Sequence, residues 1–562
     1  MKISIYMYRV FSLCLILLTF SACEKELTEL NQNPNGIDPA TANPNMIMPI
    51  VLGGAAQNYL GLGYGNIAGV VQHTQKDGWF DGHNQYNWNA QDWTGWFGLL
   101  RNNKLMYERA VELDWEFHQG VALTMKSFIF GAITDLWGDA PYSDALQGDE
   151  GSLRFEYPVF DSQETIYNGI IEDLKAAAAL FANADNTGIN SSNDLYYNGD
   201  IKNWERFANS LLLRYYMRIS GKNPSLAQSG IEAIYQTGNY LQSADQDATL
   251  PYTGQGSDVW PTEYSGDSGS NFRRLKPCQT LIDQLTSTAD PRLEVWIDPV
   301  HCQWVEDESL TDEVDPFIRK NGVIMEGIAA MEDVEYIDAI AQGDIFTRRY
   351  NPNLTAASLN DAVYVGLPAG LQQPSSYNLN PTPGQSVENQ HVSQLSEMYR
   401  EGGGDLLRAR LISAAEVHFI LAEAALNGWS VGDAAAHYQN GVKASLETWE
   451  VGDQYDDFIA NVSFDGTLEQ IIQQKWVASW TAATEAWFDF RRTGLPALTA
   501  GPAAAQPVLP VRFNYGTDEL NNNETNALEA VSRLEITDYS GARGKDSQWS
   551  KPWLLQGTGK PW

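Results

Sequence analysis

Hydrophobic side chains recur at three- and four-residue steps over much of the N-terminal half, a spacing that predicts amphipathic helices. One run follows a helix-start signal at residues 162–164, and another ends at Gly221 and Pro224, which form a stop signal. The apolar positions are Ile166, Ile170, Ile171, Leu174, Ala178 and Phe181 in the first run, and Phe207, Leu211, Leu212, Tyr215 and Ile219 in the second. This half is therefore expected to be mainly α-helical.

Three further helices are expected toward the C-terminus, at residues 406–427, 433–449 and 468–492. The second of them has small, aromatic and small residues four and three positions apart, at Ala434, Tyr438 and Gly441. Tetratricopeptide repeats use this spacing to pack two helices closely. Because one helix pair cannot bury its apolar stripe alone, stacked neighbours are needed. The pattern predicts a mainly α fold built as a tetratricopeptide-like helical scaffold.

The pattern changes between residues 224 and 404, where short periodic pieces are separated by Gly, Pro, Asn and Asp. Such punctuation is typical of turns, so this stretch is expected to be a large, loop-rich insertion on the ligand side. We expect a single domain at 41–562. Its parts are an N-terminal helical scaffold at 41–223, the insertion at 224–404, C-terminal helical repeats at 405–494 and an irregular C-terminal segment at 495–562.

The N-terminus has the features of a bacterial lipoprotein signal. Two basic residues precede an apolar run that is too short to span a membrane, and small residues then lead to Cys23. Residues 20–23, Phe-Ser-Ala-Cys, resemble a lipobox, in which the cysteine is acylated and becomes the first residue of the mature protein. The expected signal peptide is 1–22. The acidic tether at 23–40 resembles those that place lipoproteins on the outer face of the outer membrane.

Acidic residues greatly outnumber basic ones, with 71 Asp and Glu against 36 Lys and Arg and a formal net charge of −35. Loss of residues 1–22 removes Lys2 and Arg9 and no acid, so the mature chain is near −37. A field of this sign repels phosphate backbones and anionic head groups, so no nucleic-acid partner is expected. Cys278 and Cys302 could pair in an oxidising compartment, although a chain of this length does not depend on a disulfide.

No catalytic motif has the structural context that it needs. Residues 266–270, Gly-Asp-Ser-Gly-Ser, resemble the nucleophile loop of chymotrypsin-like proteases, but the surrounding pattern is helical. With so many acids, carboxylate pairs suited to glycoside hydrolysis occur at any spacing and carry no signal. His301 and Cys302 have no further ligands at metal spacing, so no metal site is predicted from them. The Asp-rich residues 307–315 could bind a structural calcium ion, and no other cofactor is expected.

Aromatic and polar side chains alternate between residues 75 and 97. Rings stack on the apolar faces of sugars, and amides and carboxylates pair with hydroxyls, so this mixture favours glycan recognition; a peptide groove could use the same residues. The candidate ligand residues here are Trp79, Phe80, Asp81, His83, Tyr86 and Trp88. Of these, Trp79, Tyr86 and Trp88 are expected to be exposed.

Other rings fall into two groups. Those at the front of the helix that continues through residue 106 are expected to pack inward: Trp93, Trp96 and Phe97. Those in the insertion add Trp260 and Tyr264 as further ligand candidates, with Trp296 and Trp304 as weaker ones. Trp296 alternates with Val295 and Ile297, a pattern that also suits a core position.

Five segments spread over nearly the whole mature chain resemble the SusD/RagB family of outer-membrane nutrient-binding lipoproteins, in its SusD-like second branch. They are KSFIFGAITDLWGDAPY at 126–142, DPRLEV at 290–295, YVGLP at 364–368, AAEVHFILAEA at 414–424, and QKW, EAW and RRTG within 474–494. The resemblance implies about four tetratricopeptide-like helix pairs with an irregular ligand-side half. Trp137, Asp139, Arg491 and Arg492 belong to family hallmarks and are interpreted as structural, as buried pairs usually are.

The same resemblance implies a function. Such proteins cap a SusC-like TonB-dependent transporter as a lid that captures oligosaccharide or, in some members, peptide. A non-catalytic, cell-surface glycan-binding lipoprotein is therefore the first hypothesis, with an oligopeptide-binding lid as its variant. A secreted glycoside hydrolase acting on the same glycans is the alternative, and it is disfavoured because no catalytic signature accompanies the rings.

Overall fold

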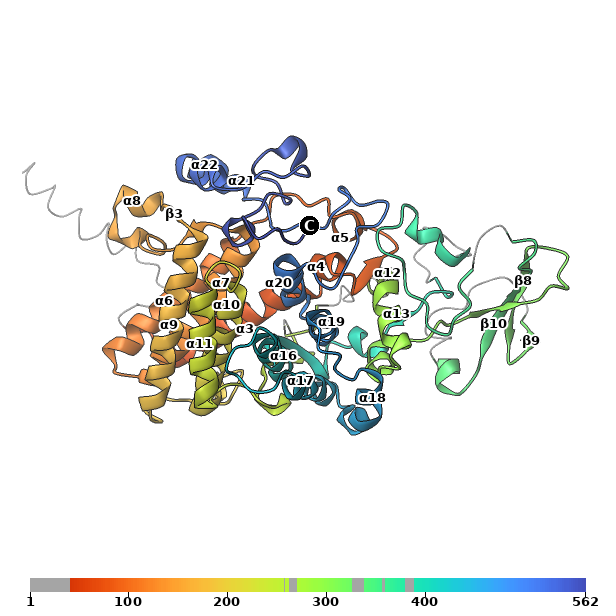
Figure 1. Cartoon of the computed structure of the whole chain (residues 1–562), viewed down its shortest axis with the longest axis horizontal. Coiled ribbons are helices and arrows are strands. Elements are labelled where there is room, and N and C mark those ends of the chain that lie inside the picture. Colours follow the sequence, from red (N-terminus) through yellow and green to blue (C-terminus); the bar gives the residue numbers. More distant parts are fainter. Residues whose placement is uncertain (1–40, 257, 262–269, 326–337, 356–358, 380–388) are drawn as a thin grey trace, which may run out of the picture.

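The computed structural model consists of a helical body from which a small β lobe projects at one end (Figure 1). No helix in the described part of the chain combines the length and the apolar character that crossing a bilayer requires. The predicted signal peptide, Cys23 and the tether lie outside the described residues. Those described are 41–256, 258–261, 270–325, 338–355, 359–379 and 389–562.

The N-terminal half is a stack of long helices, as the apolar periodicity predicts. Ser162 caps the helix expected after it by accepting a hydrogen bond from the backbone N–H of Thr165, and Asp200 caps the next one through its side chain. The helices are α3 (Pro44–Gly63), α6 (Thr94–Glu112), α7 (Glu116–Trp137), α9 (Gln163–Asn183), α10 (Ile201–Arg218) and α11 (Pro224–Thr237). The prediction of a mainly α fold is confirmed.

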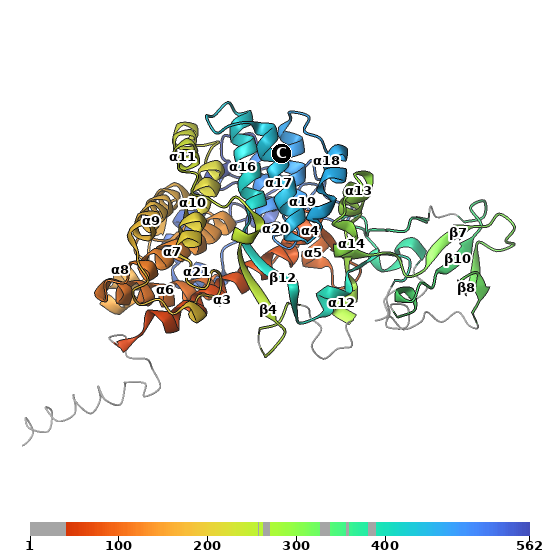
Figure 2. The same ribbon diagram turned by 90° about the horizontal axis from the view of Figure 1, so that it is seen from below.

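The C-terminal half adds two helical hairpins beside this stack (Figure 2). Their helices are α16 (Ala414–Leu426), α17 (Ala434–Thr448), α19 (Leu468–Ala478) and α20 (Ala483–Thr493). A Cβ added to Gly441 of α17 would lie 2.9 Å from the ring of Phe419 on α16. The small residue of the repeat signature therefore permits the close approach of α16 and α17.

Three boundaries predicted from periodicity are wrong. Residues 406–412 belong to strand β12 (Gly403–Ile412), which pairs antiparallel with β4 (Ala248–Thr253). Leu407, Ala409 and Leu411 lie on one buried face of the strand, and its last residues, which include Arg410 and Ile412, are buried on both faces. The helix expected at 468–492 is interrupted between α19 and α20, where Thr481 has a left-handed φ of 66°. Residues 224–237, assigned to the loop-rich insertion, form α11 and pack against α10.

The lobe is a four-stranded sheet in the order β7-β10-β8-β9 over a small core. Its strands are β7 (Gln303–Glu306), β8 (Val314–Lys320), β9 (Val323–Ile324) and β10 (Phe346–Tyr350). The other strands pair in twos, as β1 (Thr74–Lys76) with β5 (Leu275–Pro277), β2 (Ala140–Pro141) with β3 (Phe160–Asp161), and β6 (Ile297–Asp298) with β11 (Gln394–Leu395). The short helices are α4 (Asn66–Val70), α5 (Asp81–Asn84), α8 (Leu153–Glu156), α12 (Ser270–Arg274), α13 (Gln279–Ser287), α14 (Leu293–Trp296), α18 (Tyr455–Asn461), α21 (Thr517–Asn522) and α22 (Glu524–Ser532).

The thiols and acids of this region do not form the sites considered from the sequence. Cys278 and Cys302 are both buried and both free, so they do not pair with each other. Asp307 accepts a hydrogen bond of 2.8 Å from Arg349, and the 307–315 segment ends in an ion pair between Asp315 and an arginine of β8. Within the described ranges, no three His, Cys, Asp or Glu side chains are grouped as a metal site.

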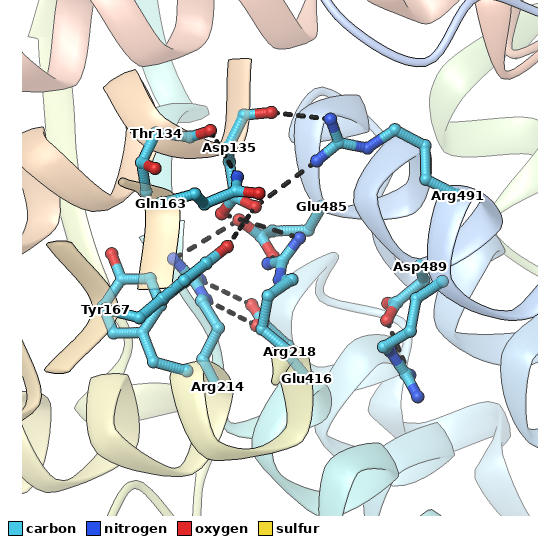
Figure 3. Close-up of polar contacts among 12 residues, drawn as sticks. Thr134, Asp135, Gln163, Tyr167, Arg214, Arg218, Glu416, Glu485, Asp489 and Arg491 are labelled. Atoms are coloured by element: carbon cyan, nitrogen blue, oxygen red, sulfur yellow. Dashed lines mark hydrogen bonds and ion pairs between the residues drawn. The ribbon is translucent and has the colours of Figure 1, made fainter. Parts of the chain in front are cut away.

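A buried network of ion pairs joins the two helical halves (Figure 3). Arg214 of α10 donates two hydrogen bonds of 2.7 Å to Glu416 of α16. Arg218, one turn further along α10, pairs with Glu485 of α20 and lies 3.8 Å from Asp135 of α7. Four helices thus meet around charged groups that are almost wholly removed from water.

Burial and charge oppose each other within this network. Burial raises the pKa of Glu485, but Arg214 and Arg218 outweigh it, so the net pKa is lowered. The pKa of Asp135 is raised, because the effect of burial is larger than the opposing effect of Arg218 and Arg491. The Asp135 carboxylate also accepts a hydrogen bond of 2.7 Å from the Tyr167 hydroxyl. Each charge is tolerated because its neighbours compensate its lost hydration.

The family-hallmark residues belong to the same interior. Arg491 donates to the carbonyl oxygen of Asp135 at 2.6 Å, and Arg492 donates to Glu423 at 2.7 Å. Asp139 accepts from the backbone N–H of Gln163 at 2.8 Å. Trp137 is fully buried with its indole N–H bonded to a backbone carbonyl. The interpretation of these residues as structural is confirmed.

Replacing Arg218 with methionine should lower the free energy of unfolding by about 3–5 kcal/mol, because it leaves buried carboxylates without their partner. Chemical denaturation followed by circular dichroism measures this value. The matched control is Lys202→Met on the same helix, which breaks an exposed pair with Glu205 and should cost less than about 1 kcal/mol. Equal losses of unfolding free energy in Arg218→Met and Lys202→Met would contradict the assignment of Arg218 to a buried ion-pair network.

Candidate functional site

A two-stranded ribbon fixes the start of the loop that carries most candidate residues. β1 and β5 pair antiparallel, with Lys76 opposite Leu275. Just beyond the ribbon, the backbone N–H of Asp77 donates to the carbonyl oxygen of Arg274 at 3.0 Å. The loop therefore begins beside Arg274, a residue that is far away in the sequence.

Trp79 projects from this loop into solvent. Its side chain is 70% exposed, whereas the other tryptophans, all of which lie in the described residues, are buried or half-buried. Its φ of 51° is left-handed, a conformation that a bulky residue adopts only when its surroundings impose it. The guanidinium carbon of Arg274 lies 4.7 Å from the centre of a Trp79 ring, a cation–π contact. The expected exposure of Trp79 is confirmed.

Gly78 makes this contact possible. A Cβ at position 78 would lie only 2.1 Å from Nη1 of Arg274, so any other residue would displace the guanidinium. Arg274 is half-buried, and its Nε has no hydrogen-bond partner within the described residues. The side chain is therefore held mainly by the Trp79 ring and by the shape of the glycine turn.

Phe80 and Asp81 continue the exposed segment into the short helix α5. Phe80 is half-buried, and its carbonyl oxygen accepts hydrogen bonds from the backbone N–H groups of His83 and Asn84 at 3.1 and 2.7 Å. Asp81 is exposed in the first turn of the helix. A ring, a guanidinium and a carboxylate are thus carried by neighbouring positions at this surface, which we call the Trp79 surface.

His83 is buried, so its expected role as a ligand residue is wrong. Its Nε2 lies 3.0 Å from the hydroxyl of Thr74. Burial, reinforced by the charge of Lys76, lowers the pKa of the imidazole to about 3, so the ring is neutral at physiological pH. Beside it, the Asn84 side chain accepts from the N–H of Lys76 at 2.9 Å and donates to its carbonyl at 2.7 Å. Both side chains tie the loop to β1.

Tyr86 and Trp88 are also buried, so the expectation that they are exposed is wrong. Tyr86 is 0% exposed and has a left-handed φ of 59°. Trp88 donates its indole N–H to the carbonyl oxygen of Gly82 at 2.8 Å, and its ring lies edge-on to those of Trp487 and Phe513. These two rings anchor the loop to the scaffold and cannot stack on a ligand.

The described candidates in the middle of the chain are likewise not exposed. Trp260 is 1% exposed, with the ring of Tyr64 at 5.1 Å, so its expected role in binding is wrong. Trp296 and Trp304 are buried as well. Tyr264, like the protease-like segment around residue 268, lies outside the described residues. The inward packing expected of Trp93, Trp96 and Phe97 is confirmed, the first two being buried and the third half-buried.

Local sequence could not separate the exposed ring from the buried ones. Trp79 and Trp88 both stand among polar residues and glycine, but Asn84, four positions before Trp88, uses its side chain to satisfy backbone groups of Lys76. Arg274 and Gly78 were not predicted at all, because their contact depends on the pairing of β1 with β5. The resulting surface suits a ligand that has a flat apolar face and hydrogen-bonding groups.

Comparison with known proteins places this fold in a family. The family model described as starch-binding, associating with the outer membrane, matches residues 37–310 and 348–516. No curated protein sequence matches the chain.

Three solved structures with the same fold cover nearly the whole chain. A SusD homologue from Bacteroides fragilis is 20% identical, covering 92% of this chain and 100% of its own, with a TM-score of 0.67. A chitin-binding protein is 23% identical, with coverages of 92% and 99% and a TM-score of 0.66. A chitin-binding SusD homologue from Flavobacterium johnsoniae is 19% identical, with coverages of 91% and 99% and a TM-score of 0.62.

The extent of the family match and the agreement of the folds lead to one conclusion: the chain belongs to the SusD-like family of nutrient-binding proteins.

Proposed function

We propose that this protein is a non-catalytic, cell-surface lipoprotein that binds oligosaccharide and delivers it to a SusC-like TonB-dependent transporter. The observation that carries the proposal is Trp79, a largely exposed indole held in a left-handed backbone conformation. A left-handed backbone costs stability at a bulky residue, and Arg274 lies over one face of the ring. The other face can stack on the apolar face of a sugar.

The chemistry of binding follows from the neighbouring groups. The guanidinium of Arg274 and the carboxylate of Asp81 can donate to and accept from sugar hydroxyls, while the ring supplies contact area. The names of two structural relatives, both described as chitin-binding, support a glycan as the ligand class. Hydrogen bonds from Asp77 to Arg274 and from His83 to Phe80 order the backbone that carries these groups before the ligand arrives, which lowers the entropic cost of binding.

The positions of unusual acids support a binding role over hydrolysis. A glycosidase needs a carboxylic acid with a raised pKa next to the bond that it cleaves. The described acids whose pKa burial raises are Asp135, Asp139, Asp247 and Glu519. None of them lies at the Trp79 surface: Asp247, for example, accepts from the first N–H of α16 at 2.7 Å, and Glu519 accepts from the indole N–H of Trp93 at 3.0 Å. The Trp79 surface has a ring, a guanidinium and the exposed carboxylate of Asp81 instead.

Replacing Trp79 with alanine should weaken oligosaccharide binding about ten-fold, since one stacked ring contributes roughly 0.5–1.5 kcal/mol beyond the area that it buries. Arg274→Met should weaken it by a similar factor. Calorimetry with maltohexaose and chitohexaose measures both effects. Thermal stability should stay within about 2 °C of the parent, because Trp79 is exposed and methionine keeps the apolar stem of the half-buried Arg274.

The control for this experiment is Trp88→Ala. It removes a buried ring of the same loop, so it should lower the melting temperature by several degrees. Unchanged affinity in Trp79→Ala and Arg274→Met, together with full stability, would show that the ligand binds elsewhere.

The lipoprotein part of the proposal concerns the N-terminus. Changing Cys23 to alanine removes the thiol that the expected acylation requires, so the protein should leave the membrane fraction or retain its signal peptide. Fractionation and protease accessibility of intact cells measure this outcome. A variant that fractionates with the outer membrane and reaches the surface like the parent would contradict it.

The partner is tested by mild detergent extraction. A tethered binding protein needs a membrane-spanning protein to move its ligand inward, so a TonB-dependent barrel should co-purify with the tagged lipoprotein. Recovery of the lipoprotein alone, from extracts in which such barrels remain intact, would count against the proposed delivery step.

A further inference from the structure

Two adjoining cavities lie on the helical half of the molecule, away from the Trp79 surface. One of about 400 Å³ opens between α6, α7 and residues 142–150, and one of about 300 Å³ opens between the start of α6, residues 141–158 and α21. Both are lined by Ala145 and Leu146, and we call the two cavities together the α6–α7 trough. In both ribbon views α6 and α8 lie toward one end of the body, well separated from α5, which follows Trp79 (Figures 1 and 2).

The size and lining of the trough are those of a ligand site. The larger cavity alone reaches the range of small-molecule pockets. The larger cavity is lined by aliphatic side chains and by rings. Rings are present in both cavities: Tyr107, Phe130 and Tyr142 in the larger, and Phe97, Phe155 and Tyr157 in the smaller. Rings spaced along a trough can contact successive units of an extended ligand.

Asn103 provides an independent indication. This residue of α6 lines the larger cavity and is only 3% exposed. Its amide nitrogen donates to the carbonyl oxygen of Ala122 at 2.8 Å, which fixes the amide orientation because a carbonyl can only accept. Its Oδ1 is buried and has no hydrogen-bond partner among the described residues. An unused buried acceptor is costly, and the O–H or N–H donor of a ligand would satisfy it where the side chains that cover this oxygen move aside.

The charges of the trough restrict the ligand class. Lys126 pairs with Asp173 at 2.8 Å, and Lys104 lies 3.6 Å from Glu108 while donating to the Leu146 carbonyl at 2.8 Å. Both ammonium groups are therefore engaged. The lining also contains Glu150, Glu156 and Glu519, so acids outnumber bases in the trough and a phosphate or carboxylate ligand is disfavoured. The walls α6 and α7 are helices, so they offer no strand edge for an extended peptide to pair with.

We propose that the α6–α7 trough is a second binding site, for a neutral oligosaccharide, and that it acts independently of the Trp79 surface. Hydroxyl or acetamido groups of the sugar would supply the donor for Asn103, and its apolar faces would stack on rings such as Tyr107 and Tyr142. The proposal shares its ligand class with the proposed function but depends on none of the same residues. Two separated sites on one lipoprotein would let it hold a long glycan at two points, which raises avidity without new contacts.

The test uses the chain from residue 24 onward and titrates it with maltohexaose and chitohexaose. Calorimetry should give two sites per chain for the parent, and Trp79→Ala should weaken one of them about ten-fold. In the Trp79→Ala background, Ala145→Trp fills the wall common to both cavities and should abolish the unweakened site, and Tyr107→Ala should weaken that site about ten-fold. Arg101→Ala, an exposed position of α6 outside the trough lining, is the matched control and should leave it unchanged.

The outcomes separate the two proposals. Weakening of all binding in Trp79→Ala, or binding that Ala145→Trp leaves unchanged, would overturn the trough site and leave the Trp79 proposal standing. Two sites in Trp79→Ala that keep the affinities of the parent, one of which Ala145→Trp removes, would support the trough and overturn the Trp79 surface. No binding of either hexasaccharide by the folded parent would overturn both. Circular dichroism of each variant verifies that it is folded.

Discussion

The pairing of Arg218 with Glu485 is the contact on which the rest of the structure depends. It joins α10 of the N-terminal stack to α20 of the C-terminal hairpins, and both side chains are at most 7% exposed. Charges removed from water in this way are tolerated only when their partners are in place, so the two halves cannot shift past one another without a large penalty. Arg214 with Glu416 adds a second connection, from α10 to α16. The two helical halves pack as one body because buried ion pairs join them in addition to apolar contacts.

Contacts with α20 hold the loop that carries the Trp79 surface. Two residues after Glu485, Trp487 places its ring 5.7 Å from that of Trp88, and Trp88 in turn bonds the carbonyl oxygen of Gly82. The loop between Gly82 and Trp88 is therefore closed against α20, and the exposed segment before it has little freedom. Because the loop is already ordered, binding of a flexible ligand to the ring carries no added entropic cost of ordering the loop.

Local periodicity was sufficient to predict the helices but not to predict which residues form the site. Helix α9 and its Ser162 cap could be predicted because the apolar stripe and the capping signal are both local. Strand β12 was mistaken for helix because its partner β4 lies far away in the sequence, and the exposed ring could not be told from its buried neighbours for the same reason. The contact of Arg274 with Trp79 exists only once β1 and β5 have paired. Composition identified the loop, and tertiary pairing decides which of its rings meets solvent.

The central claim is that the fold presents Trp79 to a ligand and hides the other rings of its loop. Oxidative footprinting with a tryptophan-selective reagent, read out by mass spectrometry with and without saturating oligosaccharide, tests it most directly. The account predicts rapid modification of Trp79, protection of Trp79 by the ligand, and slow modification of Trp88 and Trp260 in both states. Modification of Trp88 or Trp260 at a rate comparable to that of Trp79 in the folded protein, or a Trp79 that a bound oligosaccharide leaves unprotected, would contradict it.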